Sequence, residues 1–230
     1  MGECSLEMSN AGLLMKRCFD FLLALLGLML MWPALLAFGL FIKAEDHGSV
    51  FYRGPRVGLG GRPFRILKFR TMRPDAERSG VTSTANDDPR VTRIGSVLRR
   101  YKLDELPQLW NVLRGDMSLI GPRMSLVGPR PEVQRFVDLY TEEEKAILTV
   151  RPGLTDWASL WNIDEGATLE GSADPDQAYC ELIRPKKLQL QLAYVRQAGF
   201  WTDLGILCQT MGAVLFRVKF CEARALELGS

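Results

Sequence analysis

The longest hydrophobic stretch of the chain runs from Phe21 to Ile42 without a charged residue. A stretch of this length can cross the hydrocarbon core of a bilayer as a helix. Trp32 and Pro33 lie in its middle, where a proline removes a backbone hydrogen bond and bends a helix. Basic residues flank both ends, whereas a spanning helix carries its excess on the cytoplasmic side. The flanking residues are Lys16, Arg17 and Lys43. The pattern therefore admits a kinked transmembrane helix, and also a re-entrant helix that bends at Trp32-Pro33 and returns to the same face.

Alternation of apolar and basic residues follows this segment. Val50–Arg53 is strand-like, and Phe64–Arg70 has the period of two that is typical of a half-buried strand. The glycine-rich stretch Gly58–Gly61 between them predicts a loop, and it matches neither a P-loop nor a dinucleotide fingerprint. The polar, turn-rich residues Pro74–Arg90 predict a longer loop.

Helical spacing begins after this loop. Thr92 can cap a helix that ends at Tyr101, and Asp104 opens a second helix that Gly115 ends. The apolar positions of the second helix, Leu106, Leu109, Trp110 and Leu113, repeat at helical spacing. We expect Leu106, Leu109 and Trp110 to lie in the core.

The second half of the chain is predicted to be mostly helical. Residues Pro131–Leu148 form a helix that is interrupted near Tyr140, and Asp164–Asp176 form an acidic, mobile loop. Two further helices cover Pro175–Ala198 and Asp203–Phe220. The last one has an apolar face that could lie on a bilayer or in a core.

These elements predict a mainly α fold with a small β element, in the α+β class. We expect residues 1–43 to form an N-terminal segment with the membrane helix. Residues 44–230 would form one compact catalytic domain with interfacial amphipathic helices, because no interdomain linker interrupts them.

Composition excludes several classes of function. The net charge is +2, and no helix-turn-helix or zinc-finger spacing appears, which argues against nucleic acid as a partner. The five cysteines are widely spaced without a CxxC pair, which argues against a disulfide framework and structural zinc. His47 is the only histidine, so mechanisms that need several histidines are excluded.

The candidate chemistry centres on two adjacent carboxylates, Asp104 and Glu105. Arg99, Arg100 and Lys102 precede them closely. Adjacent like charges need a neighbouring cation, a metal ion or a proton. The pair therefore indicates phosphate and divalent-metal chemistry. The alternative is a solvated helix start in which both carboxylates favour the helix dipole.

Arginines on rigid turns follow the acidic pair. The segment Ser118–Met124 (SLIGPRM) is repeated almost unchanged as Ser125–Pro131 (SLVGPRP), which places Arg123 and Arg130 after a Gly-Pro pair. Arg151 lies in another turn, Arg-Pro-Gly. A rigid turn can hold a guanidinium against phosphate, and it can equally be an exposed turn.

Several motifs resemble, in order and over roughly residues 12–220, those of the bacterial sugar transferases, the monotopic polyprenyl-phosphate phosphoglycosyl transferases. The motifs are the apolar segment with its central proline, Phe51–Arg53 (FYR), Phe64–Met72 (FRILKFRTM), Asp88–Gly95 (DPRVTRIG), Leu103–Leu113 (LDELPQLWNVL), Gly115–Leu119 (GDMSL), Gly128–Glu132 (GPRPE) and Val150–Thr155 (VRPGLT).

The resemblance implies an enzyme on the cytoplasmic face of the bacterial inner membrane, anchored by a re-entrant helix. Such enzymes transfer a sugar 1-phosphate from a UDP-sugar to a polyprenyl phosphate such as undecaprenyl phosphate, and release UMP. This is the first membrane step of glycoconjugate and polysaccharide synthesis. Carried over, Asp104 is the nucleophile that forms a phosphosugar ester, and Glu105 helps it hold Mg²⁺. Lys68, Arg99 and Arg130 would bind phosphate, and Arg151 the nucleotide.

The chain departs from the family pattern at the repeated Gly-Pro-Arg segment. Counting from the acidic pair, Arg123 holds the family position, whereas the following Pro131-Glu132 favours Arg130. We prefer Arg130.

Two other readings stay open. A membrane-anchored homologue could bind or scaffold without turnover, because the repeat alters the site. A phosphatase or nucleotidyl enzyme with an ordinary membrane anchor would release phosphate or pyrophosphate and form no protein adduct. The sequence does not identify the sugar, and we expect residues 156–180 to select it.

Overall fold

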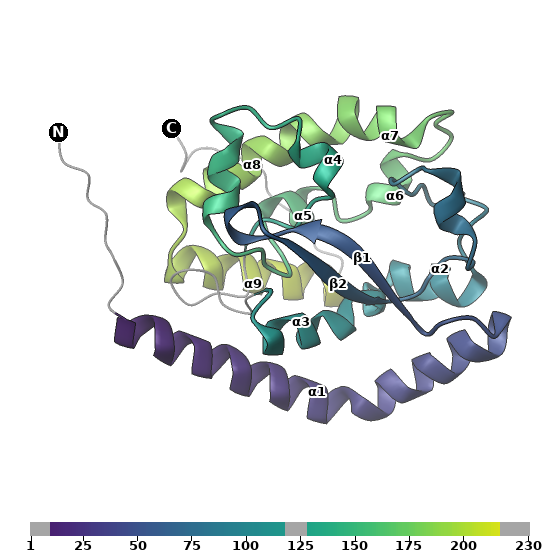
Figure 1. The fold of residues 1–230 in the computed structure, drawn as a ribbon, viewed down its shortest axis with the longest axis horizontal. Helices are drawn as coiled ribbons and strands as arrows, with labels where there is room; N and C mark the ends of the chain where they lie inside the picture. Colours follow the sequence, from purple (N-terminus) through teal and green to yellow (C-terminus); the bar gives the residue numbers. More distant parts are fainter. Residues whose placement is uncertain (1–9, 118–127, 217–230) are drawn as a thin grey trace.

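The computed structural model describes residues 10–117 and 128–216. Its first element is the 37-residue helix α1, Asn10–Asp46, which contains Pro33. Figure 1 shows α1 as a shallow bow beneath the other elements, with both ends turned up toward them. It is one continuous bent helix rather than a hairpin of two helices, and a re-entrant path through a bilayer stays a prediction.

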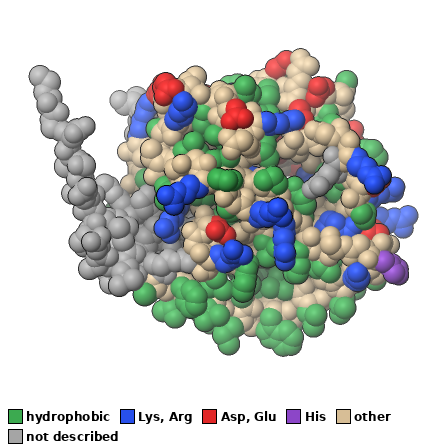
Figure 2. Space-filling model, in the orientation of Figure 1, with side chains coloured by type: hydrophobic (Ala, Val, Ile, Leu, Met, Phe, Trp, Pro, Cys, Tyr) green, Lys and Arg blue, Asp and Glu red, His purple; other side chains and the backbone are tan. Residues whose placement is uncertain are grey.

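Most of the apolar surface of α1 is exposed. Among the described residues, Phe21–Asp46 is the one helical stretch long and apolar enough to cross a membrane, with a mean hydropathy of 2.3 and 6% of the most apolar window buried. Figure 2 shows hydrophobic side chains gathered along this lower edge of the molecule. The exposed apolar surface of α1 therefore needs a nonaqueous partner.

The two predicted strands are confirmed. Strands β1, Phe51–Val57, and β2, Pro63–Phe69, pair antiparallel with Gly54 opposite Ile66. A 3-10 turn at Leu59–Gly61 joins them. This two-stranded ribbon crosses the domain above α1 and α3 (Figure 1), and it carries Lys68 near its end.

The predicted cap of the next helix is also confirmed. Helix α2, Arg93–Arg100, begins after Thr92, whose hydroxyl accepts a hydrogen bond from the Gly95 amide at 2.9 Å. The acidic pair, however, does not open an α-helix. Lys102 adopts a left-handed conformation with φ of 56°, and a 3-10 helix covers Leu103–Gln108. Helix α3, Leu109–Arg114, follows and ends at Gly115 with φ of 89°.

The expected core role of Trp110 is wrong, because its side chain is 50% exposed. The change from 3-10 to α geometry at Leu109 alters which residues share a face. Leu109 and Val112 pack with Ala24 of α1 and Ile66 of β2, so Trp110 lies on another side of the short helix.

The second half is more broken than its pattern indicates. The predicted helix Pro131–Leu148 consists of the short helix α4, Gln134–Val137, and a 3-10 helix, Glu144–Thr149. Its predicted interruption near Tyr140 is confirmed, and the helix is further limited because Val133 is extended. The short helix α5, Trp157–Trp161, was not predicted.

The predicted loop Asp164–Asp176 contains helix α6, Glu165–Thr168, because the Asp164 carboxylate caps its amides at Ala167. The predicted helix Pro175–Ala198 is confirmed in three joined parts. These are α7, Pro175–Ala178, a π-helical turn, Tyr179–Ile183, and α8, Arg184–Gln197. Helix α9, Phe200–Phe216, begins three residues earlier than predicted, and the predicted residues 217–220 lie outside the described part.

The core consists of several small clusters. Trp157, Leu190, Tyr194 and Ile206 join α5, α8 and α9. Phe69 and Leu98 pack with Ile42 of α1, so the apolar helix contributes to the same folded body. Two carboxylates reinforce this attachment. Glu45 accepts hydrogen bonds from the Arg93 and Ile94 amides at the start of α2, and Asp46 pairs with Arg70.

Candidate functional site

A cleft of about 1430 Å³ opens between the ribbon, α2 and the 3-10 helix on one side and the α5–α8 segments on the other. Basic side chains from distant parts of the chain line it. They are Arg53, Arg56, Lys68, Arg70, Arg73, Arg99, Arg100, Lys102, Arg130 and Lys187. Lys and Arg side chains are visible across this face in Figure 2. Such a concentration of cations favours a polyanionic ligand.

The acidic pair lies in the wall of this cleft. Glu105 Oε1 accepts a hydrogen bond from Lys68 Nζ at 2.9 Å and also pairs with the Arg130 guanidinium. The structure thus brings together Lys68, Asp104, Glu105 and Arg130, as the sequence predicts. Three separate segments supply them: β2, the 3-10 helix, and the turn before α4.

The two carboxylates have different electrostatic environments. Burial by itself would raise the pKa of Glu105, but the charges of Arg130 and Lys68 outweigh it and hold that pKa well below its usual range. Glu105 is therefore a fixed anion that is already neutralised.

Asp104 is only 8% exposed, and within residues 10–117 and 128–216 no hydrogen bond or ion pair engages its carboxylate. Burial raises the pKa of Asp104, and the charge of Lys68 opposes that rise. Burial likewise lowers the pKa of Lys102. Asp104 is therefore a desolvated carboxylate in the wall of a cationic cleft, and no described residue pairs with it.

The other predicted site residues differ in how the structure places them relative to the acidic pair. Arg99 is half-buried in the cleft wall, and its charge also lowers the pKa of Asp104. Arg123 lies outside the described residues. Arg130 occupies the position beside the acidic pair, which is consistent with our preference for it.

Arg151 is not among the residues that line the described cleft wall. Its turn is tied to the Gly-Pro-Arg turn, because the Gly128 amide donates to Thr155 O at 2.9 Å and the Gly153 amide to Pro129 O at 3.3 Å. A Cβ on Gly128 would meet Arg151 O at 2.8 Å, so this close approach needs glycine.

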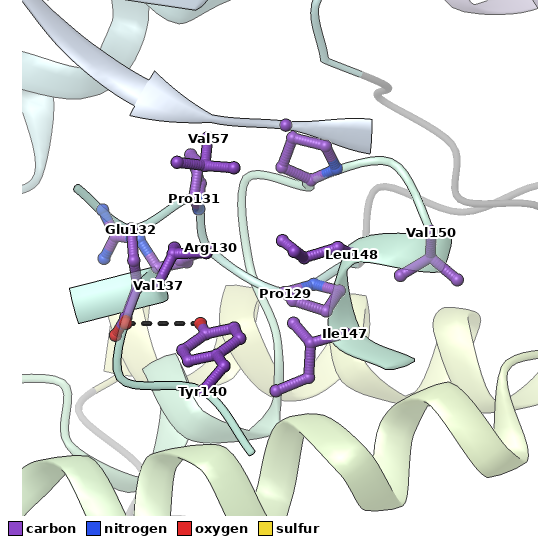
Figure 3. Close-up of a pocket in the computed structure, with 12 residues that line it drawn as sticks. Val57, Pro129, Arg130, Pro131, Glu132, Val137, Tyr140, Ile147, Leu148 and Val150 are labelled. Carbon is purple, nitrogen blue, oxygen red and sulfur yellow. Dashed lines mark hydrogen bonds between the residues drawn. The ribbon is translucent and has the colours of Figure 1, made fainter. Parts of the chain in front are cut away.

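Sequence reasoning missed a buried network next to Arg130. Glu132 accepts hydrogen bonds from Tyr179 Oη and Lys187 Nζ, both at 2.5 Å, and from Tyr140 Oη at 3.3 Å. Figure 3 shows the Tyr140 hydroxyl directed at this carboxylate, beside a small gap of about 20 Å³ lined by apolar side chains. The Glu132 partners lie up to 55 residues away, and no sequence spacing indicates them.

Asp156 was also missed. It is fully buried, caps α5 through the Ser159 amide at 2.7 Å, and accepts a hydrogen bond from the Arg130 amide at 3.3 Å. Its position before a short apolar helix is a capping signal that the sequence does carry.

A divalent metal fits the donor set of the acidic pair. The described residues contain no group of three or more His, Cys, Asp or Glu side chains suited to a metal ion. Mg²⁺ commonly takes only one or two carboxylates and completes its shell with water and substrate phosphates. Among the described residues, no side chain pairs with Asp104 and the partners of Glu105 contact Oε1 alone, so oxygen donors remain available at both residues.

Comparison with known proteins adds a family to this geometry. The family model described as "Bacterial sugar transferase" matches residues 11–124 and 123–217. The two matches meet inside the Ser118–Pro131 near-repeat, which agrees with an extra copy of that segment.

Curated proteins that are similar to this chain have names that agree with this family. The UDP-N-acetylgalactosamine-undecaprenyl-phosphate N-acetylgalactosaminephosphotransferase of Aeromonas hydrophila is 37% identical over 87% of this chain and 43% of its own length. The UDP-glucose:undecaprenyl-phosphate glucose-1-phosphate transferase of Escherichia coli is 35% identical over 89% and 41%. The exopolysaccharide production protein ExoY of Sinorhizobium fredii is 38% identical over 86% and 84%.

The chain thus spans about two fifths of the first two relatives and most of the third. The family match extends over the apolar helix and over the ribbon, the acidic pair and the Arg130 turn, which line the cleft. On this evidence the chain belongs to the bacterial sugar transferase family.

Proposed function

We propose that this protein transfers a sugar 1-phosphate from a UDP-sugar to a polyprenyl phosphate and releases UMP. The observation that carries the proposal is that the two adjacent carboxylates have different environments. Asp104 is buried and has no hydrogen bond or ion pair to a described residue, whereas its neighbour Glu105 is neutralised by Lys68 and Arg130. A carboxylate that no described residue pairs with, lying among fixed cations, suits nucleophilic attack on a phosphoryl group.

The proposed reaction has two steps at one phosphorus atom. An Asp104 carboxylate oxygen attacks the β-phosphorus of the UDP-sugar, and the bond from that phosphorus to the bridging oxygen breaks, so UMP leaves. A phosphate oxygen of the polyprenyl phosphate then attacks the same phosphorus and the Asp104 oxygen leaves. The product is a polyprenyl diphosphate sugar, and the Asp104 carboxylate is restored.

The surrounding cations would stabilise the charge that accumulates in these steps. Lys68 and Arg130 are held by Glu105, so they are oriented before substrate arrives. Arg99 lies in the same wall and would contact phosphate, and Arg151 would support the nucleotide side through its turn. Asp104 and Glu105 would hold Mg²⁺, which supplies charge neutralisation for the phosphoryl group when bound.

The membrane helix fits a lipid substrate. The relatives' names state that they act on undecaprenyl phosphate, and α1 offers an apolar surface directly below the domain (Figure 1). We propose that α1 is re-entrant, that α9 lies at the interface, and that the cleft faces the cytoplasm. Because Ser159–Gly166 line the cleft, we propose residues 156–180 as the segment that selects the sugar.

The test is UMP release by the purified protein with polyprenyl phosphate and a panel of UDP-sugars. We expect Mg²⁺-dependent release that Asp104→Asn abolishes. Mass spectrometry after incubation with donor alone should find a sugar-phosphate adduct on Asp104. An active preparation that never carries this adduct would contradict the mechanism.

The same assay separates the alternatives. A scaffold would bind donor without UMP release, in the parent and in Asp104→Asn alike. A phosphatase or nucleotidyl enzyme would release phosphate or pyrophosphate. Arg114→Met is a suitable control, because Arg114 is exposed and lies outside the described cleft wall.

A further inference from the structure

We propose that Lys187 and Gln191 of α8 are positioning residues that fix the Arg130 guanidinium against Glu105. The inference rests on the proposed function, because it assigns residues to the same site. Neither residue belongs to the acidic pair or to the predicted phosphate-binding residues. Lys187 lines the cleft, but its ammonium group donates to Glu132 and Tyr179. They act through two buried carboxylates, Glu132, which is two residues after Arg130, and Asp156, which accepts a hydrogen bond from the Arg130 amide.

The first carboxylate follows Arg130 in the chain. The Glu132 side chain is 2% exposed, and Lys187 Nζ donates to it at 2.5 Å and to Tyr179 Oη at 2.8 Å. Burial alone would lower the pKa of Lys187, but Glu132 outweighs it and raises that pKa. The backbone is held as well, because the Val57 amide donates to Glu132 O at 2.9 Å. Residue 132 is thus fixed at both its side chain and its main chain.

The second carboxylate binds Arg130 itself. Asp156 Oδ2 accepts the Arg130 amide at 3.3 Å and Gln191 Nε2 at 2.9 Å. Asp156 and Gln191 are both fully buried. The other carboxylate oxygen of Asp156 is engaged by Ser159, so the side chain cannot rotate freely.

Helix α8 connects the two anchors. Lys187 and Gln191 are four residues apart, so they lie on the same face one turn from each other. A single rigid helix therefore sets both ends of the Arg130-Pro131-Glu132 segment. Pro131 restricts that segment further. The guanidinium reaches Glu105 from a backbone that α8 has already placed.

Placement of this kind matters because phosphoryl transfer depends mostly on positioned charge. A misplacement of about 1 Å by a remote substitution can lower the rate by roughly a hundredfold. We therefore expect Lys187 and Gln191 to affect turnover through Arg130 rather than through substrate contact.

The test has one arm that does not need activity. Hydrogen–deuterium exchange of the full-length protein in lipid nanodiscs is measured at residues 128–132, whose amides are those of Gly128, Arg130 and Glu132. We expect exchange at least about threefold faster in Lys187→Met and in Gln191→Met than in the parent. Arg196→Met is the matched control, because it removes an exposed ion pair of the same helix, to Glu143. Gln191→Met is included because it removes a neutral side chain and Asp156 keeps its hydrogen bonds from the Arg130 amide and Ser159, so it is the milder change if Lys187→Met loses the fold.

The second arm is a double-mutant cycle on kcat/KM with Arg130→Ala. We expect Lys187→Met and Gln191→Met each to lower kcat/KM about tenfold or more in the parent, and less than about twofold in the Arg130→Ala background. Equal losses in both backgrounds, or unchanged exchange at residues 128–132, would overturn the inference. If the parent releases no UMP, the proposed function fails separately and the exchange arm alone decides.

Discussion

Two neighbouring side chains in one wall of the cleft carry the same charge but have different environments. Glu105 lies between Lys68 and Arg130, whereas no described partner holds Asp104. The low pKa of Glu105 keeps it anionic, and burial raises the pKa of Asp104. A nucleophilic carboxylate must be deprotonated, so activity should fall as the pH falls through the pKa of Asp104. The pH profile therefore reports on this residue.

Removal of Lys68 should move that profile toward higher pH. Lys68 lowers the pKa of Asp104, so Lys68→Met raises it and the acidic limb of kcat/KM shifts upward. We also expect a loss of at least about tenfold at the optimum, because an oriented cation is missing. The measurement is UMP release from low to neutral pH, with Arg53→Met as a control from the same cleft. A lower rate with an unmoved limb would show that Lys68 does not act on Asp104.

Removal of the Glu105 charge should shift the acidic limb of kcat/KM in the opposite direction. The Glu105 carboxylate raises the pKa of Asp104, and it also neutralises Lys68 and Arg130. In Glu105→Gln both effects are lost, so the pKa of Asp104 falls and the acidic limb moves to lower pH. The same UMP assay measures it. Shifts of equal sign in Lys68→Met and Glu105→Gln would contradict this electrostatic account.

The end of α1 is the element that joins the apolar helix to the domain. Arg70 is 7% exposed, pairs with Asp46, and donates through Nε to Ser49 O at 2.5 Å. Glu45 binds the free amides at the start of α2, where a carboxylate also favours the helix dipole. These polar contacts at the last turn of α1 add to the apolar packing of Ala24 and Ile42 in fixing the orientation of α1.

We expect Arg70→Met to lower the free energy of unfolding by about 2–3 kcal/mol, because it breaks charged hydrogen bonds and leaves Asp46 without its partner. Urea unfolding in detergent micelles measures the change. Arg114→Met is the control, because the Arg114–Asp116 pair is 3.8 Å apart with Arg114 66% exposed, and its loss should cost less than about 1 kcal/mol. Equal effects of the two substitutions would show that the α1 contact contributes little.

The whole molecule combines a cationic cleft with an apolar bow beneath it (Figures 1 and 2). Pro33 lies inside α1, and a proline there removes one helical hydrogen bond and clashes with the preceding turn. A bent helix whose two ends turn up toward the same domain fits a re-entrant path better than a straight crossing.

This path can be tested by labelling in vesicles of known orientation. We expect Cys4 and a cysteine at exposed position 47, introduced as His47→Cys with the other cysteines replaced, to react from the same side. In Pro33→Leu the helix can straighten, and Cys4 should become reactive from the opposite side. Opposite-side labelling in the parent would instead support an ordinary transmembrane helix.

The sequence by itself determined the local elements and the identity of the main polar residues. Period-two alternation predicted the ribbon, Thr92 predicted the start of α2, and the uncharged apolar run predicted the long helix α1. These features depend on neighbours in the chain, so periodicity and capping reveal them. The side-by-side carboxylates were visible for the same reason.

Only the tertiary structure decided which cations meet those carboxylates. Lys68 is 37 residues from Glu105, and Lys187 is 55 residues from Glu132, and no local rule relates such positions. The same packing exposed Trp110, which has the spacing of a core residue, and shortened the helix predicted after Pro131. Charge pairing and burial are set by how distant segments pack, so the different states of Asp104 and Glu105 follow from the fold and not from their adjacency in the chain.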